Sequence, residues 1–155
     1  MSGSHHYTLT VRWTGNTGAG TRTYQSYTRD YEVSAEGKAS MIAGSADVNY
    51  RGDGARWNPE DLLVASLSAC HKLWFLHLAA QAGVTINAYI DKPEGTMNVA
   101  ADGGGEFTAC VLRPTITLAD SAQEHDADAL HAKAHAMCFI ARSVRFPITV
   151  EATYR

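Results

Sequence analysis

The stretch from residue 58 to residue 83, NPEDLLVASLSACHKLWFLHLAAQAG, decides the fold. Asn58 is a good N-cap, Pro59 suits the first helical position, and Gly83 suits the left-handed position that ends a helix. Apolar residues between these ends recur at steps of three and four, so they share one face. The members of this stripe are Leu63, Leu67, Cys70, Trp74 and His77. We therefore predict one long core helix here.

A second helix is predicted over residues 121–143, where Ser121 followed by Glu124 forms a capping box. Its apolar stripe lies in ALHAKAHAMCFIARSV (129–144). The members of that stripe are Leu130, Ala134, Met137, Cys138 and Ala141. If the two stripes pack together, the thiols of Cys70 and Cys138 meet.

Alternating apolar residues and turn signals predict strands in the rest of the chain. The expected strands cover residues 7–13, 29–33, 39–43, 86–90, 95–101, 107–118 and 148–154, with the middle group forming a β meander. The order of strands, helix, strands, helix and strand is typical of an α+β domain with antiparallel sheet. We expect a single domain spanning residues 1–155.

Composition excludes several classes of function. The 155 residues are 45% apolar, enough for one sizeable core. A net charge of −3 and scattered arginines argue against a nucleic-acid partner. No stretch is expected to span a membrane and the start lacks the apolar segment of a signal peptide, so we expect a cytoplasmic protein without a membrane partner. Three widely spaced cysteines fit a reducing compartment. His5 and His6 are given no role.

The cysteines carry the chemical signal of this sequence. A free cysteine is often only a small buried hydrophobe, and Cys110, in TACVLRPTI, is interpreted in that way. Cys70 and Cys138 differ because each lies on the core stripe of its own predicted helix. A reactive dithiol also needs a nearby cation, because an unperturbed thiol is mostly protonated at neutral pH.

Two motifs resemble a known family. NPEDLLVASLSACH, leading into the first helix, and AHAMCFIARSV, on the second, are similar to the osmotically inducible and organic hydroperoxide resistance proteins, the OsmC/Ohr family. The resemblance implies an intertwined homodimer of α+β fold with a reactive and a resolving cysteine. It also implies a stress-response peroxidase that reduces organic hydroperoxides, uses a dithiol reductant and needs no cofactor.

The resemblance assigns roles to matching positions. Cys70 occupies the position of the peroxidatic thiol and Cys138 that of the resolving thiol. Glu60, in NPEDLL, matches the glutamate that orients a catalytic arginine. For that arginine the first candidate is Arg51, in NYRGDG.

Two other arginines remain open as alternatives, because one branch of the family places its arginine near the N-terminus. These are Arg22 and Arg29. The chain also has His71 directly after the first cysteine and Phe139 directly after the second, where better-known branches commonly have proline. These departures favour a less characterised OsmC-like branch.

A plain structural interpretation exists for each of the other residues. Glu60 complements the positive end of the helix dipole, and Arg51 beside Asp53 is a solvated loop charge. The apolar side chains near the cysteines either form a substrate pocket that favours alkyl hydroperoxides or belong to the core. They are Leu67, Trp74, Phe75 and Met137.

Two functions compete with peroxide reduction. His131, His135 and Cys138 lie at i, i+4 and i+7 on one helical face, so with Cys70 or His71 they make a candidate tetrahedral zinc site. The other alternative is a dimeric scaffold or thiol-based sensor, which forms the disulfide but turns over slowly.

Overall fold

The computed structural model describes residues 3–155. The chain divides into two compact units, Met1–Leu62 and Leu63–Arg155, and the boundary falls inside the first turns of helix α1 (Pro59–Ala82). The content of helices and sheets confirms the predicted α+β class. Whether the two units act as a single domain stays a prediction.

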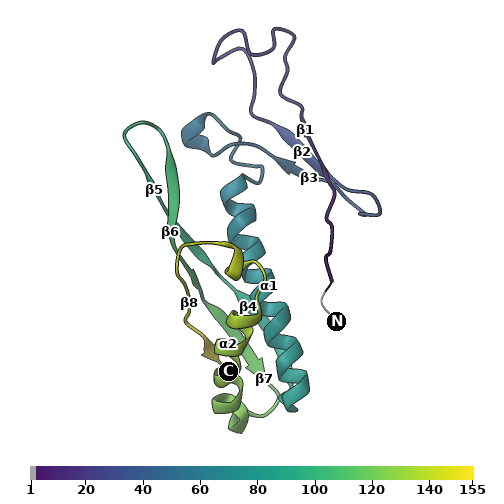
Figure 1. Cartoon of the computed structure of the whole chain (residues 1–155), viewed down its shortest axis with the longest axis vertical. Helices are drawn as coiled ribbons and strands as arrows, with labels where there is room; N and C mark the ends of the chain where they lie inside the picture. The colour runs from purple at the N-terminus through teal and green to yellow at the C-terminus, as the bar shows by residue number, and fades with distance from the viewer. Residues whose placement is uncertain (1–2) are drawn as a thin grey trace. The chain divides into compact units, whose positions relative to one another are not determined.

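The first unit contains a three-stranded antiparallel sheet in the order β1-β2-β3 (Figure 1). Its strands are β1 (Thr10–Trp13), β2 (Tyr31–Ser34) and β3 (Ile42–Gly44). The predicted strands are confirmed with ends shifted by a few residues. The turn between β2 and β3 contains Gly37, whose φ of 76° lies in the region that favours glycine. A short 3₁₀ turn, Val48–Tyr50, follows the sheet.

Helix α1 begins and ends as the sequence predicts. The Asn58 side chain accepts a hydrogen bond of 2.7 Å from the backbone N–H of Asp61, which caps the first turn. Gly83 follows the last helical residue with a φ of 74°. Local capping chemistry therefore fixes both ends of the helix.

The buried face of α1 differs from the predicted stripe. The buried residues are Leu67, His71, Phe75, Leu78 and Ala79. Cys70 and Trp74 lie at the flank of this face and are half-buried, while His77 is exposed. The predicted stripe was wrong by about one residue, because the periodicity of so apolar a helix does not distinguish neighbouring faces.

The same helix corrects the expectation about membrane spans. By length and composition α1 is apolar enough to cross a bilayer, with 24 residues and a mean hydropathy of 1.4 over its best window, of which 28% is buried. Core helices of soluble proteins pass the same test, so one such helix is weak evidence for a membrane.

The second unit builds its sheets from one long hairpin that is interrupted midway. Its strands are β4 (Ile86–Asp91), β5 (Glu94–Val99), β6 (Gly105–Leu112), β7 (Pro114–Leu118), β8 (Ile148–Val150) and β9 (Thr153–Tyr154). β5 pairs with β6 and β4 pairs with β7, so the strands are nested and the predicted meander was wrong. β8 and β9 pair in parallel with β6 and β7, so these sheets are mixed.

The interruption splits the predicted strand 107–118 at Arg113. Pro93 interrupts the opposite arm, and Asp91 accepts a hydrogen bond of 2.7 Å from the Arg113 backbone N–H. The Arg113 side chain donates to Glu94 at 2.8 Å and to Glu151 at 2.9 Å. Because proline cannot donate to a ladder, the ladder between the two arms is interrupted at this point. The pair β5–β6 lies on one side of the interruption and the pair β4–β7 on the other.

Helix α2 (Glu124–Met137) is shorter than predicted at both ends. Residue 121 lies in a 3₁₀ turn, Ser121–Gln123, that is capped by the Asp120 side chain, so the predicted capping box was wrong. At the other end Cys138 is extended, with a ψ of 111°, and a separate 3₁₀ turn, Ala141–Ser143, follows. The chain therefore leaves the helix at the cysteine.

One apolar core joins α1, α2 and β7 in the second unit (Figure 1). Its buried members are Phe75, Leu78, Ala79, Val84, Ile116, Leu118, Ala127 and Ala134. Two small alanines of α2, Ala127 and Ala134, are buried in this core together with Phe75, Leu78 and Ala79 of α1. This packing places the end of α2 beside the middle of α1.

Candidate functional site: a thiol pair and an arginine pocket

The structure brings Cys70 and Cys138 together. Cys70 lies on α1 and is half-buried, whereas Cys138 directly follows α2 and is 1% exposed. Both are free thiols, and they lie close enough to interact, because Cys70 contributes to the raised pKa of Cys138. Two neighbouring thiols can be joined as a disulfide once one of them is oxidised.

The surroundings of Cys138 keep its thiol protonated. Burial, followed by the interaction with Cys70, raises the pKa of Cys138 to about 11. A hydrogen bond of 3.3 Å from the backbone N–H of Ala141 to the sulfur opposes this shift. The buried member of the pair is therefore the poorer nucleophile in the resting protein, and the half-buried Cys70 is the more accessible one.

The apolar surface near the thiols differs from the predicted pocket. Phe75 and Leu67 are buried in the cores of the second unit, so they do not line a pocket. A shallow cavity of about 230 Å³ is lined by Leu73, Trp74 and His77 instead. The Trp74 ring meets the 65% exposed Phe139 ring edge to face, at 5.7 Å between centroids. An apolar surface thus exists on this helix face.

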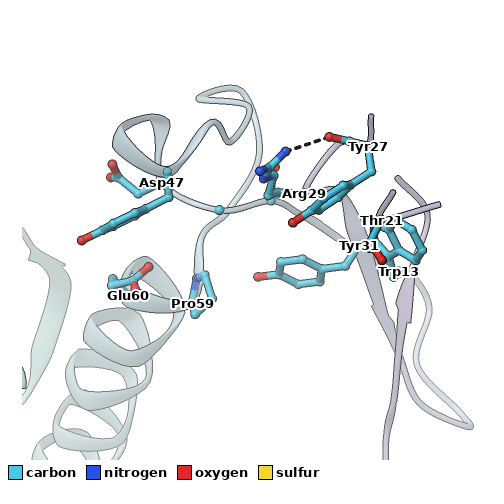
Figure 2. Close-up of a pocket in the computed structure, with 11 residues that line it drawn as sticks. Trp13, Thr21, Tyr27, Arg29, Tyr31, Asp47, Pro59 and Glu60 are labelled. Atoms are coloured by element: carbon cyan, nitrogen blue, oxygen red, sulfur yellow. Dashed lines mark hydrogen bonds between the residues drawn. The ribbon is translucent and has the colours of Figure 1, made fainter. Parts of the chain in front are cut away.

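The first unit contains a second candidate site, a pocket of about 440 Å³ with four aromatic side chains among its eleven lining residues (Figure 2). Its lining residues are Trp13, Thr21, Tyr27, Arg29, Tyr31, Ser45, Ala46, Asp47, Tyr50, Pro59 and Glu60. Arg29 and Glu60 therefore face the same pocket, a cation and a carboxylate together. Glu60 comes from the first turn of α1, as its place after Pro59 requires.

The three candidate arginines occupy different places. Arg29 is half-buried and lines the pocket together with Glu60. Arg51 is exposed, has a left-handed φ of 64° and does not line this pocket. Its guanidinium carbon lies 5.7 Å from the ring centre of Tyr24. Arg22 is exposed and also outside the pocket lining.

The side chains of His131, His135 and Cys138, predicted to share one helical face, do not come together in the structure. His131 is buried and contacts His71 on α1, with 2.9 Å between Nδ1 of His131 and Nε2 of His71. Across residues 3–155 no three His, Cys, Asp or Glu side chains gather as metal ligands do. The predicted zinc site is therefore not formed, because the imidazole of His131 turns into the core instead.

This histidine pair was not predicted from the sequence. Burial, then repulsion from His131 and His135, lowers the pKa of His71 to about 4, and burial also lowers the pKa of His131. Nδ1 of His71 and Nε2 of His131 are buried without a hydrogen-bond partner in the described residues. The only sequence signal was a histidine within an apolar helix, and its partner lies 60 residues away.

The chain is an α+β protein with one thiol on its first core helix and a second, neighbouring thiol directly after the other core helix. The model of the OsmC-like protein family matches residues 52–153, which include both thiols and Glu60. The chain is a member of the OsmC-like family. A search of curated proteins found no match.

Solved structures of the same fold support this membership. An OsmC-like protein of unknown function from Vibrio cholerae is 28% identical, with a TM-score of 0.86 over 97% of this chain and 100% of that one. An organic hydroperoxide resistance protein OsmC from Legionella pneumophila is 20% identical, with a TM-score of 0.66 over 97% and 98%. One from Elizabethkingia anophelis is 20% identical, with a TM-score of 0.65 over 97% and 96%. The last two show similarity of fold alone.

Proposed function

We propose that this protein is a thiol peroxidase that reduces organic hydroperoxides through Cys70 and Cys138. The observation that carries the proposal is the contact between a half-buried thiol on α1 and a buried thiol at the end of α2. Family membership supports it, as do fold neighbours described as organic hydroperoxide resistance proteins.

The reaction has two steps inside the protein. The Cys70 thiolate attacks one oxygen of the hydroperoxide, the O–O bond breaks, and the alkoxide leaves and takes up a proton to become an alcohol. The sulfur, oxidised by two electrons, is then a sulfenic acid. Cys138 attacks that sulfur, which forms the disulfide and releases water. A dithiol reductant then exchanges with the disulfide and restores both thiols.

An arginine serves this reaction because negative charge moves from sulfur to oxygen. The guanidinium stays charged and offers several donors in a fixed plane. The sequence alone favours Arg51 for this role. Its place outside the pocket that contains Glu60 leads us to propose Arg29 instead. The family resemblance assigns Glu60 to orient that arginine; the two line one pocket, but no ion pair joins them in residues 3–155.

The partners follow from the same proposal. The reductant is a dithiol, because it must return two electrons and two protons to a disulfide. We further propose the homodimer and the cytoplasmic location that family resemblance and cysteine usage led us to expect.

The first prediction concerns the two cysteines. Cys70→Ser is expected to abolish consumption of an alkyl hydroperoxide, because no sulfenic acid forms. Cys138→Ser is expected to allow one equivalent per protein and then stop, with a sulfenic acid that a dimedone adduct reveals by intact mass. Assays of the hydroperoxide remaining after set times, with a dithiol such as dithiothreitol or dihydrolipoate as reductant, measure both outcomes.

Cys110→Ser is the matched control, since Cys110 is buried on β6 and the proposed reaction does not use it. Its turnover should equal that of the wild type. Equal multiple turnover by wild type and Cys70→Ser contradicts the peroxidase proposal. Formation of the disulfide by wild type, followed by reduction too slow for turnover with every dithiol tried, favours the sensor alternative.

A further inference from the structure

The Arg29 guanidinium lies against two tyrosine rings. Its central carbon is 4.2 Å from the ring centre of Tyr24 and 4.2 Å from that of Tyr27. A guanidinium is planar and weakly hydrated, so aromatic faces attract it strongly. We call Tyr24 and Tyr27 the tyrosine clamp.

The clamp also holds the guanidinium through its backbone. One terminal nitrogen of Arg29 donates to the Tyr27 carbonyl at 2.8 Å, a bond that Figure 2 shows, and the other donates to the Tyr24 carbonyl at 2.9 Å. Arginine carries five N–H donors, so three remain for other partners. The orientation of the group is fixed, but its donors are not exhausted.

No carboxylate within residues 3–155 forms an ion pair with this cation. Among the described residues, Arg29 has no carboxylate oxygen within 4.0 Å, whereas Arg113 is paired with both Glu94 and Glu151. Ring faces and carbonyl oxygens stabilise the charge of Arg29 without cancelling it. A fixed cation on the wall of an aromatic pocket is a site for an anion with an apolar body.

We infer that Tyr24 and Tyr27 are positioning residues that hold Arg29 ready for an anionic group in this pocket. This inference rests on the proposed function, in which the anionic group is the alkoxide oxygen that leaves when the O–O bond of the hydroperoxide breaks. It goes further by assigning a role to two residues outside the family motifs. Arg29 is the residue that meets the anion in this inference, and the clamp acts through Arg29.

The test begins with binding, so that it needs no turnover. The probe is benzoate, an anion with an aromatic body, titrated into the full chain by calorimetry. We expect saturable binding by wild type, loss in Arg29→Leu, and binding weakened about tenfold in the Tyr24→Leu/Tyr27→Leu double variant, in line with two lost cation–π contacts. The Tyr24→Phe/Tyr27→Phe variant keeps the ring faces and should bind as wild type does.

Guanidinium rescue separates positioning from general damage to the fold. In Arg29→Ala the clamp is intact and empty, so millimolar guanidinium chloride is expected to bind there and restore benzoate binding. The same salt should fail with Arg29→Ala/Tyr24→Leu/Tyr27→Leu. Arg56→Ala, which removes an arginine paired with Asp30 and Asp53, is the matched control and should retain benzoate binding.

Peroxidase assays on the same variants distinguish the two proposals. The Tyr24→Leu/Tyr27→Leu variant should lower kcat/KM about tenfold, and the Tyr24→Phe/Tyr27→Phe variant should lower it less than twofold. If no variant, wild type included, reduces peroxide but the binding pattern holds, the proposed function fails and the clamp stands. The clamp is overturned, whatever the peroxidase result, by two outcomes together. The Tyr24→Leu/Tyr27→Leu variant binds benzoate as tightly as wild type, and guanidinium restores benzoate binding equally well with and without the two tyrosines.

Discussion

At the scale of single residues, the His71–His131 pair places a constraint on pH. One nitrogen of each ring takes part in the bond between them, and the other nitrogen of each is buried without a partner. A proton added to His71 is buried against another imidazole instead of being hydrated. The folded protein therefore favours the neutral form of the pair.

The second prediction follows from this preference. Because the folded-state pKa of His71 is lowered from 6.5 to about 4, the unfolded chain binds more protons between these values. The free energy of unfolding should therefore be greatest above pH 6.5 and fall toward pH 4, by up to about 3 kcal/mol at about 1.4 kcal/mol per pKa unit. Urea unfolding across this pH range measures it.

The double variant His71→Leu/His131→Leu is expected to lose this part of the pH dependence. The exposed His125 of α2 provides the control, and His125→Gln should follow the wild-type profile. Asp128 and Asp91 attract a proton onto His131 and partly offset its burial, which is why the prediction concerns His71 first. Parallel profiles for wild type and the double variant exclude this role.

At the scale of elements, the two helices differ in how well the sequence predicts them. The ends of α1 follow from Asn58, Pro59 and Gly83, because a cap is a local interaction between neighbouring residues. The end of α2 carries no such signal: Cys138 turns into an extended conformation where neither glycine nor proline stands. That turn depends on burial of the thiol beside α1, which is a tertiary effect.

The third prediction tests the cap of α1. Asn58→Ala removes the acceptor for the Asp61 N–H, and it should lower the free energy of unfolding by about 1 kcal/mol. Asn58→Asp keeps an acceptor oxygen and adds charge at the favourable end of the helix, so it should be close to wild type. Urea unfolding at pH 7.5 compares them. A loss by Asp equal to that by Ala assigns the effect to something other than capping.

The candidate site was predictable only where a motif or local pattern carried it. The motifs identify Cys70, Cys138 and Glu60, and the structure shows the contact between the two thiols. The choice among arginines was not predictable, because it depends on which loop residue lines the pocket with Glu60. The tyrosine clamp was missed for the same reason: residues 24, 27 and 29 show no regular spacing that indicates stacking.

At the scale of the whole molecule, the second unit is one long hairpin with a change of partner strands in the middle. Arg113 lies at that point, where it joins Glu94 of β5 to Glu151, which directly follows β8. These ion pairs are exposed, so they contribute little energy individually. Their location where the ladder of the hairpin is interrupted still ties β5 to the segment that follows β8.

The fourth prediction concerns the stability of the oxidised molecule. Cys70 and Cys138 are separated by 68 positions in the sequence, so a disulfide between them closes a long loop in the unfolded chain. Loop-closure entropy of this size corresponds to about 4 kcal/mol. One equivalent of hydroperoxide is therefore expected to raise the melting temperature of wild type. Cys138→Ser should show no such rise, and an unchanged wild-type value with the disulfide present indicates strain in the oxidised fold.

The extended conformation of Cys138 has a mechanical consequence. A cysteine inside a helix can move its sulfur only with the turns on either side, whereas Cys138 is a joint between α2 and the short turn that follows. Under the proposed function, the sulfur of Cys138 could therefore change partners by rotation at this residue, without movement of the helices that bury the core. The apolar core would then keep the same packing in the oxidised and the reduced protein.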